Sequence, residues 1–198
     1  PENSPALLWM HPGGMTLLSA DSEDEANAAR ALNHMCLVIS VDYRLAPENP
    51  SPAAPDDCYA ALLWTADNAS VLGIDPMRIV VGGASAGAGL AALTALRARD
   101  ESGPEILFQL LTYPMLDHRN ETPSSYGVVD EFRVWNRQAN LISWNLFMTL
   151  PAANICAVGD SPALRARSWG AELLHQDLRR ALVVLLGLDA AAKRNGSK

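Results

Sequence analysis

The sequence predicts an α/β protein with a mostly parallel sheet that carries helices on both faces. Two observations support this fold class. Short apolar runs alternate with amphipathic stretches along the chain, and several of the apolar runs are continuous, as expected of strands buried on both faces. The 198 residues are expected to form a single domain, with the functional loops at the carboxyl ends of the strands.

The first predicted strand covers residues 6–10 and ends at a turn formed by residues 11–14, which contain a proline and two glycines. A helix is expected over residues 23–35, with Ser22 as its N-cap. Residues 36–41 then predict a second buried strand, because this run is continuous and β-branched.

A proline-punctuated loop over residues 43–55 leads into a predicted helix over residues 55–68. Its first turn holds Asp56 and Asp57, where negative charge suits the helix dipole. A turn is expected at Asp75–Pro76, before a third strand over residues 78–81.

A glycine-rich turn separates that third strand from a predicted small-residue helix over residues 86–99, and a fourth strand is expected over residues 106–112. The chain then looks irregular and polar over residues 117–134, before a helix at 135–148 that would contribute to a lid. Beyond it, only residues 181–188 predict another buried strand. The domain is therefore expected to consist of a core (residues 1–116), a lid-like segment (117–150) and a divergent carboxyl-terminal part (151–198).

Composition argues against several classes of function. The 15 Lys and Arg are outnumbered by 22 Asp and Glu, and this net charge of -7 without a basic run disfavours nucleic-acid binding. No apolar run is long enough to span a membrane. The 3 cysteines fit neither a disulfide framework nor a zinc site, which favours a reducing compartment and predicts a cytoplasmic protein.

The strongest local signal is the pentapeptide at residues 83–87, which fits the pattern Gly-x-Ser-x-Gly between a predicted strand and a predicted helix. In that setting Ser85 is a candidate nucleophile on a tight, strained turn, and small neighbours let the backbones approach closely. The alternative is a glycine-rich turn that contains an incidental serine.

A second signal follows the first strand, where Gly13 and Gly14 can turn two backbone N–H groups toward one point. Together with the N–H of Ala86, these groups would form an oxyanion hole for acyl transfer. The alternative is an ordinary glycine turn.

These motifs resemble the hormone-sensitive-lipase-like branch of the α/β-hydrolase esterases. The resemblance rests on His-Pro-Gly-Gly-Met at residues 11–15, Asp-Tyr-Arg-Leu-Ala-Pro-Glu at 42–48, Gly-Ala-Ser-Ala-Gly at 83–87 and Tyr-Pro-Met-Leu-Asp at 113–117. It implies that Ser85 is acylated, that Gly13, Gly14 and Ala86 hold the oxyanion, and that small carboxylic esters are hydrolysed without cofactor or metal.

Three positions depart from the motifs of that branch: Pro12 and Ala88 each replace a glycine, and Ala84 replaces an aspartate. Pro12 lacks an N–H, but not one of the two assigned to the oxyanion hole. These changes are expected to adjust the two turns without abolishing them.

The base that would activate the serine is harder to find. Asp189 is the best candidate for the acid of a Ser-Asp-His triad, and Asp160 is the alternative, but no histidine follows Asp189. Using His175 would reverse the chain order of the triad. The sequence thus predicts a fold incomplete at its amino- and carboxyl-terminal ends, as in a truncated esterase whose activity is impaired.

The sequence is therefore compatible with three interpretations: an impaired esterase acting on small esters, a non-catalytic pseudo-hydrolase that binds a small ligand, and a truncated gene product. It leaves open whether the chain forms a homo-oligomer.

Overall fold

The fold is described by a computed structural model for residues 3–127 and 135–148. Its centre is a parallel sheet with the strand order β2-β1-β3-β4, which confirms the predicted fold class. The strands are β1 (Ser4–Met10), β2 (Leu37–Val41), β3 (Ile74–Ala84) and β4 (Phe108–Thr112).

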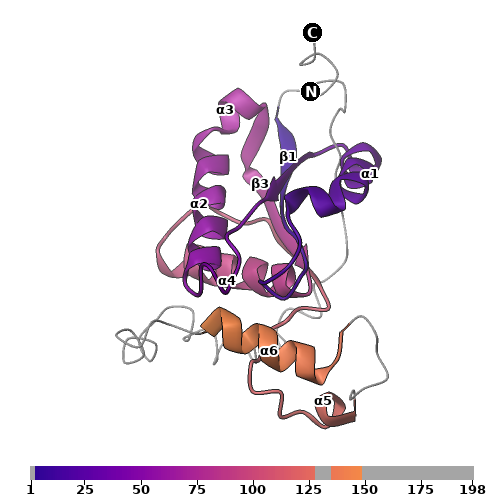
Figure 1. The fold of residues 1–198 in the computed structure, drawn as a ribbon. Coiled ribbons are helices and arrows are strands. Elements are labelled where there is room, and N and C mark those ends of the chain that lie inside the picture. Colours follow the sequence, from indigo (N-terminus) through magenta and orange to yellow (C-terminus); the bar gives the residue numbers. More distant parts are fainter. Residues whose placement is uncertain (1–2, 128–134, 149–198) are drawn as a thin grey trace.

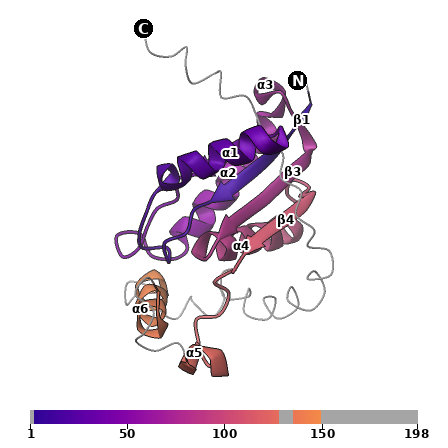
Figure 2. The same cartoon turned by 90° about the vertical axis from the view of Figure 1, so that its right-hand side faces the viewer.

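Helices cover both faces of this sheet (Figures 1 and 2). One face carries α1 (Asp24–His34), which follows the short 3₁₀ helix η1 (Ala20–Glu23). The other carries α2 (Ala53–Asp67) and α4 (Ala86–Asp100), while α3 (Ala69–Leu72) joins α2 to β3.

Successive residues of β1 supply the two halves of the core, because side chains alternate between the faces of a strand. Leu8 and Met10 pack with α2 and α4, in a cluster that includes Leu62 and Leu90. Leu7 and Trp9 point to the opposite face with Val80, Ala84 and Cys36. Every residue of β1 is buried, so this strand is the centre of the fold.

Past the carboxyl ends of the strands lie α5 (Pro123–Gly127) and α6 (Arg137–Met148). The α6 helix was expected, whereas α5 lies in a segment predicted to be irregular. The backbone of Phe147 accepts a hydrogen bond of 2.7 Å from the N–H of Ser51, which ties α6 to the loop before α2.

Several local predictions need correction. Ser22 is not the N-cap of α1, because it lies within η1 and its hydroxyl donates to the carbonyl of Ser19. The predicted turn at Asp75–Pro76 falls inside the bounds of β3, where the register against β1 shifts. The turn survives locally, since the Asp75 carboxylate accepts a hydrogen bond from the N–H of Met77.

Two strands are also less buried than predicted. β2 and β4 are half-buried apart from Val41, while β1 is buried throughout. The predicted strand at 181–188 lies outside the described residues. In the parts that the structure describes, no helix is both long and apolar enough to cross a membrane.

Candidate functional site

Ser85 lies at a sharp turn between the last residue of β3 and the first residue of α4. Its backbone has φ 54° and ψ -117°, a strained conformation for a residue with a side chain. Its N–H donates to the carbonyl of Thr112 at the end of β4, and its carbonyl accepts from the N–H of Met115. The turn is therefore held by the neighbouring strand, and the side chain is half-buried.

Glycines around Ser85 allow three close backbone contacts. A Cβ on Gly83 would collide with the backbone of Gly87, and a Cβ on Gly87 would collide with the carbonyl of Met10. One on Gly89 would meet the carbonyl of Met115. The glycine pattern around the serine is thus explained by space, as the sequence predicted.

The glycine loop (residues 11–15) follows β1 directly. Gly13 has φ 118° and Gly14 has φ 64°, a region that residues with a Cβ avoid. A Cβ on Gly13 would strike the Leu17 carbonyl. In the described part of the chain, the backbone N–H groups of Gly13 and Gly14 donate no hydrogen bond.

His11 opens the glycine loop and is completely buried. Its ring stacks on Tyr43 with the centroids 4.1 Å apart and the planes at 7°. Its Nδ1 lies 2.6 Å from the carbonyl of Pro12 and must carry the proton, because a carbonyl can only accept. Its Nε2 has no partner among the residues that the structure describes.

Burial sets the protonation state of both stacked rings. It holds the pKa of His11 below the ordinary value of 6.5, although the Pro12 carbonyl and the charges of Asp42, Glu23 and Asp21 act against it. Burial also raises the pKa of Tyr43 well above its ordinary value. The tyrosine therefore keeps its proton and donates it to the His11 carbonyl at 2.7 Å.

The fold brings the serine turn and the glycine loop to the same edge of the sheet. Met10 pairs with Gly83 in the parallel register of β1 and β3, so the two strands end side by side. The collision of a Gly87 Cβ with the carbonyls of Met10 and His11 shows that the start of α4 touches the start of the glycine loop. Of the predicted site residues, Ser85, Ala86, Gly13 and Gly14 thus share this edge.

Two residues in or just before α6 also lie against the glycine loop, and the sequence did not single them out. The indole ring of Trp135, just before α6, and the hydroxyl of Ser143 both abut Gly14, where a Cβ would strike them. The Ser143 hydroxyl also lies 3.3 Å from that of Thr16. Only the tertiary fold joins these segments, since more than 120 residues separate 16 from 143 in the chain.

The residues weighed in the sequence as the acid and the base lie beyond the described residues. The predicted acid Asp189, its alternative Asp160, and His175 are outside the described residues. His118 lies 4.0 Å from the carboxylate of Asp117, and its ring meets Trp144 edge-on. Within the described ranges, no three His, Cys, Asp or Glu side chains gather as they would around a metal ion.

A serine turn at the same edge of the sheet as a glycine loop whose Gly13 and Gly14 amides donate to no described residue is an arrangement suited to acyl transfer. Such amides can stabilise the negative charge that develops on a carbonyl oxygen when the hydroxyl attacks its carbon. The helix α4 adds the positive end of its dipole at the same place.

Comparison with known proteins agrees with this description. The profile of a family described as having the alpha/beta hydrolase fold matches residues 7–196. Among curated proteins, the chain is 42% identical over 144 residues to the carboxylesterase NlhH of Mycobacterium tuberculosis, an alignment that covers 68% of this chain and 45% of that one. The esterase LipI of the same organism is 47% identical over 111 residues, covering 56% and 35% of the two chains. The chain therefore spans less than half the length of these relatives.

Solved structures show the same likeness. A bacterial heroin esterase superimposes with a TM-score of 0.76 at 36% identity, covering 93% of this chain and 65% of that one. A hyperthermophilic esterase from the archaeon Pyrobaculum calidifontis gives 0.78 at 30% identity, with coverages of 91% and 65%.

Proposed function

We propose, on the premise that this chain belongs to the α/β-hydrolase fold family, that it is a serine carboxylic ester hydrolase acting on small, short-chain esters. The observation that carries the proposal is the strained turn at Ser85 beside the glycine loop at the ends of two paired strands. The esterases among its relatives support the same reaction class.

In the proposed mechanism, Ser85 Oγ attacks the ester carbonyl carbon and gives up its proton to a base. The carbonyl oxygen becomes an oxyanion that accepts hydrogen bonds from the N–H groups of Gly13, Gly14 and Ala86. When this tetrahedral intermediate collapses, the base returns the proton to the departing oxygen, so the alcohol is released and an acyl-enzyme remains, which water then hydrolyses. The proposed steps include neither a metal nor a cofactor.

This mechanism needs a base beside Ser85. Asp189 is the proposed acid, and none of the 4 histidines, His11, His34, His118 and His175, follows it in the sequence. His11 is an unsuitable base, because it is buried and stacked within the loop that would hold the oxyanion. We therefore propose that these 198 residues hydrolyse esters slowly, since loss of the base costs about a million-fold in turnover.

The test is hydrolysis of p-nitrophenyl acetate and butyrate by the full chain and by Ser85→Ala. We expect slow release of p-nitrophenol that the substitution abolishes. Ser102→Ala is a matched control, because Ser102 also has a positive φ, of 53°, but lies past the far end of α4. Equal rates in the wild-type chain and Ser85→Ala would contradict the proposal.

A second candidate is a pseudo-hydrolase that binds a small carboxylic acid without turnover, since the histidine of the glycine loop, His11, is buried, stacked and unsuited to act as the base. A thermal shift with short-chain carboxylates distinguishes the two. Stabilisation by the ligand in a chain that releases no p-nitrophenol would favour the binding protein.

A further inference from the structure

The segment after β2, Tyr43–Ala46, touches the glycine loop on both sides of its two glycines. The Tyr43 hydroxyl donates to the carbonyl of His11 at 2.7 Å, before the glycines. The N–H of Ala46 donates to the carbonyl of Met15 at 2.9 Å, after them. Gly13 and Gly14 are therefore bracketed by two hydrogen bonds from one short segment.

The first of these contacts is also a packed one. Tyr43 is 2% exposed and stacks face to face on the fully buried ring of His11. The bond from His11 Nδ1 to the Pro12 carbonyl holds that ring in one tautomer. Tyr43 therefore contacts both the ring and the backbone carbonyl of His11, and the Pro12 carbonyl holds the orientation of the ring.

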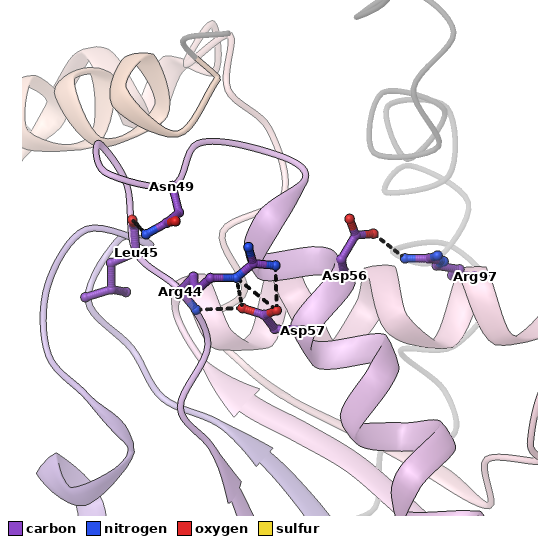
Figure 3. Close-up of polar contacts among 6 residues, drawn as sticks. All are labelled: Arg44, Leu45, Asn49, Asp56, Asp57 and Arg97. Carbon is purple, nitrogen blue, oxygen red and sulfur yellow. Dashed lines mark hydrogen bonds and ion pairs between the residues drawn. The ribbon is translucent and has the colours of Figure 1, made fainter. Parts of the chain in front are cut away.

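The residue that follows Tyr43 is joined to α2 by an ion pair between Arg44 and Asp57 (Figure 3). The Asp57 carboxylate accepts from the backbone N–H of Arg44 at 2.9 Å and from Nε and Nη2 of its guanidinium. Although burial opposes ionisation of Asp57, these bonds from the Arg44 side chain and backbone hold its pKa below the ordinary value.

We propose that Tyr43 and Asp57 are positioning residues that hold the N–H groups of Gly13 and Gly14 where the oxyanion forms. This inference rests on the proposed ester hydrolysis. Two consecutive glycines gain more conformational freedom than any other pair when their neighbours are released. Donors of an oxyanion hole act within about 2.7–3.1 Å, so a loosened loop would lose most of its effect.

Hydrogen exchange of the amides of Thr16 and Leu17, which both donate to the Gly13 carbonyl, tests the inference in the full chain without requiring turnover. Tyr43→Phe keeps the stacked ring and removes the donor to the His11 carbonyl, so exchange should rise about tenfold, as expected for one lost hydrogen bond. Tyr59→Phe is the matched control, because Tyr59 lies in the same core cluster on α2. Unchanged exchange in Tyr43→Phe, or an equal rise in Tyr59→Phe, would overturn the inference.

A second pair of variants tests the ion pair between Arg44 and Asp57 and leaves the stacked rings of His11 and Tyr43 unchanged. Asp57→Asn should raise exchange of the same amides by a few-fold, in line with a partly exposed ion pair. Asp56→Asn, one residue earlier on α2, removes the pair with Arg97 and should leave these amides unchanged (Figure 3). If the two variants change exchange equally, the ion pair of Asp57 does not hold the glycine loop in place.

The kinetics of ester hydrolysis distinguish a positioning role of Tyr43 from a merely structural one. In a chain that turns over p-nitrophenyl esters, Tyr43→Phe should lower kcat about tenfold and leave KM unchanged, because oxyanion stabilisation acts in the transition state. A change in KM alone would contradict the inference. A wild-type chain without turnover would contradict the proposed ester hydrolysis instead. The exchange data would still show whether Tyr43 and Asp57 hold the glycine loop in place.

Discussion

Glycine serves two different physical purposes within this site. Gly13 and Gly14 are needed for their backbone angles, because both have positive φ. Gly87 lies in the first turn of α4 with an ordinary helical backbone, and it is needed because the carbonyl of Met10 occupies the position of a Cβ. The sequence shows glycine in both motifs, but only the structure separates conformational need from close approach.

This distinction predicts the effect of Gly87→Ala on stability. Helix propensity alone would favour alanine by about 0.8–1 kcal/mol. We expect a net loss of about 1–3 kcal/mol instead, because the new Cβ meets backbone atoms that cannot move aside cheaply. The free energy of unfolding in urea measures it. Gly73→Ala is the control, since nothing lies within 4 Å of its Cβ and only its φ of 68° opposes the change. A stabilised Gly87→Ala variant would contradict the explanation.

At the scale of elements, α1 is held on the sheet by a polar contact with a buried tryptophan. The indole N–H of Trp9 donates to the Glu23 carboxylate at 2.6 Å, and the Arg30 guanidinium lies 3.9 Å from the ring centroid. The sequence predicted the helix and the strand separately, but no local pattern assigned a role to Glu23, which ends η1 just before α1. Tertiary contact rather than the expected cap at Ser22 determines where α1 docks.

Glu23→Ala should therefore destabilise the protein by about 1–3 kcal/mol, because it leaves the indole N–H of the buried Trp9 without its acceptor. Chemical denaturation followed by tryptophan fluorescence measures the change. Glu25→Ala, two residues later in the first turn of α1, is the matched control, since Glu25 is exposed, and it should alter stability by less than about 0.5 kcal/mol. Equal effects of the two substitutions would show that the contact with Trp9 is unimportant.

For the molecule as a whole, the buried imidazole of His11 links folding to pH. Burial lowers its pKa in the folded chain, whereas in the unfolded chain the imidazole titrates near 6.5. Between these two values the unfolded chain binds a proton that the folded chain does not. The free energy of unfolding must then fall as pH drops below about 6.5, and it levels off below the folded-state pKa.

Urea unfolding between pH 7.5 and about pH 5 tests this linkage. The wild-type chain should lose stability toward the acid end, by about 1.4 kcal/mol for each unit that separates the two pKa values. His11→Asn keeps a donor near the Pro12 carbonyl and should remove this slope, at a lower overall stability. His34→Asn controls for the loss of a histidine outside the buried core. A slope that His11→Asn leaves intact would assign the pH dependence to other groups.

The strands and the turns of the candidate site depend on neighbouring residues, so the sequence by itself predicted them. Continuous apolar runs predicted the four strands, and the two glycine motifs predicted which turns hold Ser85, Gly13 and Gly14, because period, turn chemistry and strain depend on neighbouring residues. The tertiary structure decided the strand order and the half-burial of β2 and β4. It also decided which side chains contact the glycine loop, namely those of Tyr43, Trp135 and Ser143. Those features depend on which distant segments pack together, and no local pattern encodes the partner of a side chain that lies more than a hundred residues away.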